Sequence, residues 1–253
     1  MSKKNVLITG ASSGIGMQTA YKFAENGDNL ILCARRKEKL NEIAQNIRNS
    51  WHSHVEIYEL DVTNYEMVNS IIKDLEDKKI KIDILINNAG LASGLEKFYE
   101  SDIEDIEKMV NTNVKGLLYM TRGIINQMVE ANSGHIINIG STAGVYAYEK
   151  AAVYCGTKSA VKTISDGIRI DVMDKDIKVT TVQPGLVETE FSRVRFHGDD
   201  ERAEKVYQGI EALQPEDIAD VILYVANQPK RVQITDVTVM ANQQGTGFNI
   251  FRK

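Results

Sequence analysis

Cysteine and proline are scarce in this chain, which has two cysteines and three prolines among 253 residues. Cys33 lies in an apolar segment and Cys155 follows a tyrosine, so the pair does not indicate a disulfide scaffold, and a reducing compartment fits it. An excess of positive charge is also absent, because the formal net charge is −5 and no basic block occurs. The charge pattern therefore argues against a nucleic acid or an anionic membrane as a partner.

Long apolar runs are missing as well. The first apolar segment follows Met-Ser-Lys-Lys and ends at Thr9, which is too short for a signal peptide or a membrane span. We therefore expect a cytoplasmic protein. No repeat, low-complexity tract or linker divides the chain, and 43% of its residues are hydrophobic. This composition suits a single domain over residues 1–253 with one core.

Short apolar segments rich in β-branched residues alternate with segments of helical periodicity. The predicted strands are 5–9, 29–33, 55–60, 82–86, 135–139, 178–182 and 236–240. The predicted helices include 37–49, 103–131, 151–175 and 215–227, after a first helix that ends near residue 26. The alternation predicts an α/β fold with a Rossmann-type, doubly wound, seven-stranded and mainly parallel sheet flanked by helices.

A glycine-rich turn joins the first predicted strand to the first helix. Its residues with a predicted cofactor role are Gly10, Ser12, Ser13, Gly14, Ile15 and Gly16. Glycines let the backbone turn sharply and approach a pyrophosphate, and the N-terminus of the helix offers N–H groups to it. The spacing is G-x-x-x-G-x-G, which predicts nucleotide binding; an ordinary glycine-rich turn is the alternative.

Two arginines stand where the second strand ends. In dinucleotide folds an acidic residue at this place takes the ribose hydroxyls of NAD. Here the place holds Arg35 and Arg36, which can bind a 2′-phosphate. We therefore predict NADP rather than NAD. The alternative is that both arginines only open the charged helix 37–49.

Polar residues follow the next two strands and one helix. Asp61, followed by Val62, ends the third strand, where it can take the adenine amino group or cap the next helix. Asn88 follows the fourth strand and can touch the cofactor ribose or form a plain turn. Asn113 lies beside the apolar face of its helix, where it either binds backbone or holds a water chain.

Tyr154 and Lys158 lie one turn apart if residues 151–175 form a helix. A free phenol has a pKa of about 10, and a nearby ammonium favours the phenolate. Such a tyrosine can exchange a proton with an alcohol or a ketone. Ser141, which follows the fifth strand, lies where open α/β sheets bind ligands. The alternative for Tyr154 and Lys158 is a surface pair, with the ring packed on the lysine stem.

A long polar connection follows the sixth strand and predicts a substrate lid over about residues 186–212. The predicted cofactor contacts at its start are Pro184, Gly185, Val187 and Thr189. A carboxylate substrate needs a fixed cation, and we expect Arg195 to supply it.

Several of these motifs stand together in the order and spacing of one known family. They are residues 9–16, Asn87-Asn88-Ala89-Gly90, Asn113, Ser141, Tyr154-x-x-x-Lys158 and Pro184-Gly185. The whole chain resembles the short-chain dehydrogenase/reductase family, although Gly156 replaces the usual alanine between the tyrosine and the lysine. Residues 189–200, 203–207 and 213–217, with Arg35-Arg36, resemble its NADP-dependent 3-hydroxy acid dehydrogenases.

This resemblance implies an NADP-dependent oxidoreductase of serine, L-allo-threonine and similar 3-hydroxy acids. It also implies a homotetramer and no metal. Tyr154 is the implied general acid/base, and Lys158 lowers its pKa and binds the nicotinamide ribose. Ser141 polarises the substrate oxygen, and Asn113 holds a water that links Lys158 to solvent. The alternatives are a broad-specificity carbonyl reductase for hydrophobic ketones or aldehydes, and a non-catalytic NADPH-binding sensor.

Overall fold

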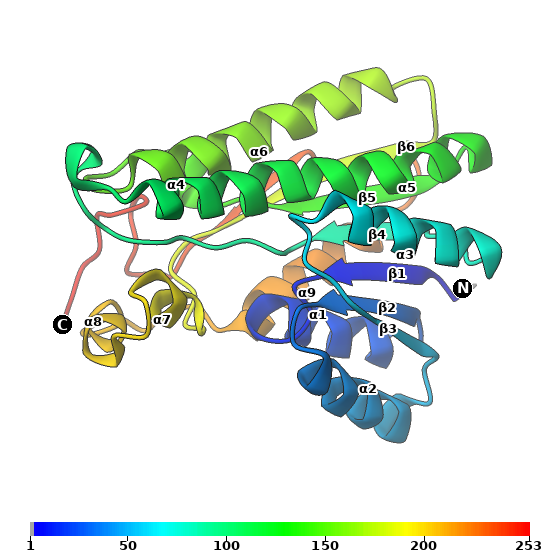
Figure 1. Ribbon diagram of the computed structural model, residues 1–253, viewed down its shortest axis with the longest axis horizontal. Helices are drawn as coiled ribbons and strands as arrows, with labels where there is room; N and C mark the ends of the chain where they lie inside the picture. Colours follow the sequence, from blue (N-terminus) through cyan, green and yellow to red (C-terminus); the bar gives the residue numbers. More distant parts are fainter. Residues whose placement is uncertain (1–2) are drawn as a thin grey trace.

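Seven strands build one parallel sheet at the centre of the computed structural model, which describes residues 3–253 (Figure 1). They are β1 (Asn5–Thr9), β2 (Asn29–Ala34), β3 (Val55–Glu59), β4 (Ile84–Asn87), β5 (Gly134–Ile139), β6 (Ile177–Pro184) and β7 (Asp236–Val239). Their order is β3-β2-β1-β4-β5-β6-β7, and every pair of neighbours runs parallel. The predicted Rossmann-type fold is confirmed.

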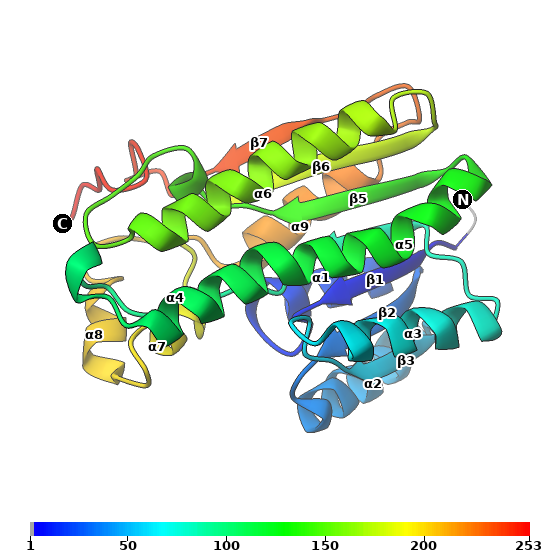
Figure 2. The same cartoon turned by 45° about the horizontal axis from the view of Figure 1, so that its top comes forward.

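Helices cover both faces of the sheet, as the turned view shows (Figure 2). Those on one face are α1 (Gly14–Glu25), α2 (Lys37–Trp51) and α9 (Pro215–Ala226), and those on the other are α3 (Tyr65–Asp77), α5 (Leu117–Ala131) and α6 (Ala152–Asp171). Alternate strand side chains feed the two cores, so Val6 and Ile8 of β1 join one cluster and Leu7 the other. Within residues 3–253, no helix combines the length and the apolar composition that crossing a bilayer requires.

The predicted helix 103–131 is divided in the structure. It consists of α4 (Ile103–Val110), a π-helical turn η2 (Asn111–Gly116) and α5. The wider turn coincides with a close approach, because a Cβ on Gly116 would lie 2.6 Å from Val62 Cγ2. It also places Asn113 against the chain that follows β4, which matches the use of such turns near functional sites.

Residues 186–212 were predicted without secondary structure, but they contain two short helices, α7 (Phe191–Arg195) and α8 (Asp200–Lys205). Both lie beyond the carboxyl ends of the strands, beside the C-terminus (Figure 1). The last residue holds this segment directly, since Lys253 N donates to Gly209 O at 2.9 Å. Two further 3₁₀ turns, η1 (Phe98–Glu100) and η3 (Thr142–Gly144), also lie outside the predicted helices.

Candidate active site

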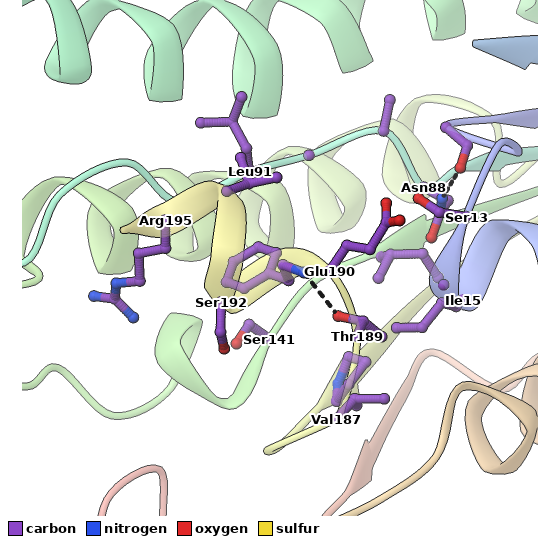
Figure 3. A pocket seen from close by; sticks show the side chains of 18 of the residues that line it. Ser13, Ile15, Asn88, Leu91, Ser141, Val187, Thr189, Glu190, Ser192 and Arg195 are labelled. Atoms are coloured by element: carbon purple, nitrogen blue, oxygen red, sulfur yellow. Dashed lines mark hydrogen bonds between the residues drawn. The ribbon is translucent and has the colours of Figure 1, made fainter. Parts of the chain in front are cut away.

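A pocket of about 450 Å³ opens at the carboxyl edge of the sheet. The predicted site residues that line it are Gly10, Ser12, Ser13, Gly14, Ile15, Arg35, Arg36, Asp61, Val62, Asn88, Ser141, Tyr154, Lys158, Pro184, Gly185, Val187, Thr189 and Arg195. Figure 3 shows Ser13, Ile15 and Asn88 at one end, and Ser141 and Arg195 at the other. Two predicted residues, Gly16 and Asn113, stand behind the lining rather than in it.

The glycine turn is shaped for an anion. Gly10 and Gly14 have φ angles of +66° and +52°, a conformation that favours glycine. A Cβ on Gly16 would lie 2.5 Å from Gly10 O, so this glycine lets α1 pack against its own turn. Ser13 precedes α1, but its side chain does not cap the helix. The first-turn N–H groups are therefore left for a ligand, and the turn fits a pyrophosphate.

Arg36 links the glycine turn to the 186–212 segment. Its guanidinium donates to Ser12 Oγ at 3.2 Å and to Ser13 Oγ at 2.7 Å. The same group pairs with Glu190 at 3.0 Å. Arg35 is exposed beside it. Two cations thus stand at the rim where the 2′-phosphate is predicted, in the short connection between β2 and α2.

Asp61 and Asn88 resolve two of the alternatives. Asp61 Oδ1 accepts from the backbone and hydroxyl of Thr63, at 2.9 and 2.8 Å. It is Asn64 that caps α3, by accepting from Met67 N, so Asp61 does not act as the cap. Asn88 Nδ2 donates to the carbonyls of Thr9 and Gly10 at 3.0 and 3.2 Å and thereby braces the glycine turn.

Asn113 is buried, and both the oxygen and the nitrogen of its side-chain amide form hydrogen bonds within the protein. Its Oδ1 accepts from Leu91 N at 2.8 Å, and its Nδ2 donates to Leu91 O and to Thr157 Oγ1, at 2.8 and 3.0 Å. Of the two alternatives for Asn113, the structure therefore shows the one in which its side chain binds the backbone. A water chain from Asn113 to Lys158 stays a prediction.

Tyr154 and Lys158 are both buried on α6, with exposed fractions of 7% and 6%, so the surface-pair alternative is excluded. Burial raises the pKa of Tyr154, whereas a hydrogen bond with Ser141 and the charge of Arg195 act to lower it. Desolvation therefore outweighs the neighbouring charges here, and the lowering of this pKa by Lys158 stays a prediction.

Lys158 itself is the most deeply buried cation of the pocket. Its Nζ donates to Ile139 O at 2.8 Å, and burial lowers its pKa to about 8. A Cβ on Gly90 would lie 3.4 Å from that Nζ and 3.2 Å from Asn113 Oδ1. A side chain at this position would therefore press on Asn113 Oδ1 and touch the Lys158 ammonium.

Arg195 reaches the pocket from the last residue of α7. Its Nε donates to Gly94 O at 3.2 Å and its Nη1 to Tyr148 Oη at 2.8 Å. The guanidinium carbon lies 5.8 Å from the centre of the Tyr154 ring. The third nitrogen, Nη2, is buried without a hydrogen-bond partner. The guanidinium thus lies close to the Tyr154 ring, and one of its donors has no partner.

Sequence reasoning missed several residues of this end of the pocket. They include Tyr148, Phe191, Tyr207, Gln244 and Gly247. Phe191 packs on the Tyr154 ring at 5.7 Å, and Tyr207 Oη donates to Val187 O at 3.1 Å. The only signal in the sequence is that Phe191 and Tyr207 are aromatic residues within the polar 186–212 segment.

Comparison with known proteins agrees with this geometry. A family model described as short chain dehydrogenase matches residues 4–200. This chain belongs to the short-chain dehydrogenase family. It is 43% identical over 251 residues to a Schizosaccharomyces pombe protein named NADP-dependent 3-hydroxy acid dehydrogenase, with 99% of this chain and 97% of that protein covered. A Salmonella typhi protein of the same function name is 44% identical over 249 residues, with 98% and 99% covered.

Solved structures are similar to this short-chain dehydrogenase over almost its whole length. The closed form of a serine dehydrogenase complexed with NADP⁺ superposes with a TM-score of 0.91 at 42% identity, covering 98% of this chain and 100% of that one. Serine dehydrogenase from Escherichia coli gives a TM-score of 0.81 at 36% identity, with 95% and 99% covered.

Proposed function

We propose that this short-chain dehydrogenase is an NADP-dependent 3-hydroxy acid dehydrogenase. Its full-length relatives carry that name, and the site contains the features that the activity needs. The anion-binding turn and the two rim arginines fit a phosphorylated dinucleotide. The observation that carries the substrate assignment is Arg195 Nη2, buried and unpaired in the pocket.

The nicotinamide cofactor supplies the acceptor for the hydride that leaves C3 of the hydroxy acid. The chain supplies the path of the proton. Ser141 and Tyr154 hold the C3 oxygen, and Tyr154 takes the hydroxyl proton on oxidation or returns it on reduction. Because burial raises the pKa of Tyr154, the resting phenol is protonated and ready for the reduction direction. In oxidation the phenol first gives up this proton and then takes the one from the C3 hydroxyl. Lys158 keeps a positive charge one helical turn from Tyr154 and binds the cofactor ribose.

Arg195 holds the substrate carboxylate in this proposal. Two of its nitrogens already donate to Gly94 and Tyr148, and the third, Nη2, has no partner. A carboxylate that reaches Nη2 gains a charge-assisted hydrogen bond and supplies the partner that this buried donor lacks. Residues 186–212, which carry Arg195, act as the lid over this contact.

The test is a substrate panel with purified wild type and Arg195→Ala. NADP⁺ and NAD⁺ are paired with L-serine, L-allo-threonine and their methyl esters, and NADPH with neutral ketones. Loss of Arg195 is expected to raise KM for the acids about tenfold or more, since a hydrogen bond to a charge is worth about 1.5–3 kcal/mol, and to leave KM for the esters and ketones unchanged. Equal rises in KM for acids and neutral compounds reject Arg195 as the anchor. Turnover of neutral ketones alone favours the carbonyl-reductase alternative.

We further propose a homotetramer in the cytoplasm. The support is a set of apolar side chains exposed on α5 and at the end of α6, which have no cover within one chain. They include Leu118, Val129, Ile170 and Met173. Light scattering on the purified protein measures the state directly, and a monomer at micromolar concentration rejects the tetramer.

A further inference from the structure

The orientation of the Arg195 guanidinium is set from outside the lid helix. α7 has only five residues, too few to fix a long side chain by itself. The Nη1 group instead donates to Tyr148 Oη at 2.8 Å, and the guanidinium carbon lies 5.4 Å from the centre of the Tyr148 ring. Tyr148 stands in the loop between η3 and α6, so it holds Arg195 from the opposite wall of the pocket.

Tyr148 is suited to this contact because it stays neutral. Burial raises the pKa of its hydroxyl, against the opposing charge of Arg195. The hydroxyl oxygen accepts from Nη1, which leaves the phenolic proton available to a ligand. Tyr148 can therefore fix the guanidinium and donate to the same carboxylate that the guanidinium binds.

The C-terminal tail in turn holds Tyr148. The ring of Phe248 meets the Tyr148 ring edge-on, with ring centres 4.0 Å apart. The tail that carries Phe248 folds into a turn on Gln244, whose side chain accepts from Leu186 N at 3.0 Å and donates to Gly247 O at 3.2 Å. Gly245 N closes the turn by donating to Asn249 O at 2.8 Å. The tail is thus tied to the start of the lid and packs on the residue that holds Arg195.

We infer that Tyr148 and Phe248 are positioning residues for the acid group of the substrate. Phe248 fixes the Tyr148 ring, Tyr148 fixes the Arg195 guanidinium, and the unpaired Nη2 of that guanidinium meets the carboxylate. The C-terminal turn is therefore part of what selects a 3-hydroxy acid over a neutral alcohol. This inference rests on the proposed function, because it assumes a substrate with a carboxylate.

The test compares L-allo-threonine with its methyl ester as substrates of the full-length enzyme with NADP⁺. Tyr148→Phe keeps the ring stack and removes the hydroxyl, so we expect KM for the acid to rise about tenfold, with kcat and the ester unchanged. Phe248→Leu keeps the hydroxyl and removes the edge-on ring contact, so we expect a rise of about threefold in the same KM. Tyr146→Phe, the same change at an exposed neighbour, is expected to change neither substrate.

The outcomes separate the inference from the function on which it rests. If Arg195→Ala raises KM for the acid but both Tyr148→Phe and Phe248→Leu leave it unchanged, the positioning role is wrong and the acid dehydrogenase stands. A rise that is equal for acid and ester is a merely structural effect and also overturns the inference. If the wild type oxidises no 3-hydroxy acid, both fail. If Tyr148→Phe does not fold, Phe248→Leu alone tests the inference: a rise in KM for the acid only supports it, and an unchanged KM overturns it.

Discussion

The two edges of the parallel sheet bury titratable side chains to a similar extent, but only the carboxyl edge places them beside a cavity. At the amino edge, His135 is 4% exposed and shares a hydrogen bond of 2.9 Å with Thr180 Oγ1. At the carboxyl edge, Tyr154 and Lys158 are as well buried and line the pocket of about 450 Å³. Burial alone therefore does not distinguish a functional group from a structural one.

A buried polar group that lies beside open space can form hydrogen bonds with a ligand, and these can offset the desolvation of the group. Burial lowers the pKa of His135 to about 3, and this histidine does not line the pocket. Lys158 and Arg195 line space that a ligand can fill, and Arg195 Nη2 has no hydrogen-bond partner within the protein. We therefore expect substitutions at the carboxyl edge to change activity and substitutions at the amino edge to change stability.

The largest effect is expected for Tyr154→Phe. Removing the hydroxyl removes the proton partner, and general acid/base groups contribute about 10²–10⁴-fold to a rate. Steady-state assays should give a kcat lower by about that factor, while NADPH binding, followed by cofactor fluorescence, stays near that of the wild type. Wild-type turnover by this variant would remove Tyr154 from the mechanism.

Arg36→Ala tests the cofactor end of the same edge. The variant loses one cation at the predicted phosphate site, so kcat/KM for NADPH should fall about tenfold, with a smaller change for NADH. Lys37→Ala, at the adjacent exposed cation, is the control and should leave the preference unchanged. An equal fall in kcat/KM for NADPH and NADH would mean that Arg36 only links the glycine turn to Glu190 and does not bind the phosphate.

His135→Gln tests the amino edge through pH. The folded chain binds a proton on His135 only near pH 3, whereas the unfolded chain binds it near pH 6.5. Stability from this group is therefore present above pH 6.5 and is lost as the pH falls toward 3. Between pH 6.5 and about 4.5, the advantage of wild type over His135→Gln in free energy of unfolding should shrink by about 2 kcal/mol.

Urea unfolding of both proteins across this range measures the difference. If the free energy of unfolding of both proteins changed equally with pH, the burial of His135 would not contribute to the loss of stability at low pH. Activity per folded molecule at neutral pH should be the same in both proteins, since His135 does not line the pocket.

Gly156→Ala should have the smallest effect. Gly156 lies between Tyr154 and Lys158 but on the exposed side of α6, and an added Cβ meets nothing within 4 Å. Replacing a helical glycine by alanine stabilises by about 0.5–1 kcal/mol. Thermal unfolding should show this gain with unchanged kcat, whereas Gly144→Ala, whose Cβ would lie 2.7 Å from Lys158 O, should lose both stability and rate.

The sequence predicts best what depends on short stretches of chain. The strands and the glycine turn follow from apolar runs and glycine spacing over a few residues, and their arrangement in the sheet matches the prediction. The rim position of Arg35 and Arg36 follows directly from where β2 ends.

The remaining features depend on contacts between distant segments. Tyr148 meets Arg195 from the loop before α6. Gln244 and Phe248 reach Leu186 and Tyr148 because the tail folds back toward the 186–212 segment. The π-helical turn at Asn113 coincides with the close approach of Val62 to Gly116, which lie far apart in the sequence. The raised pKa of Tyr154 depends on burial, which its spacing from Lys158 does not reveal.

A crystal structure of this protein with NADP⁺ and a non-reacting 3-hydroxy acid analogue tests the central claim most directly. We predict the C3 oxygen within about 2.6–3.2 Å of the Tyr154 hydroxyl, with the carboxylate bound to Nη2 of Arg195. A carboxylate that points to solvent, or a C3 oxygen out of reach of Tyr154, would contradict the account.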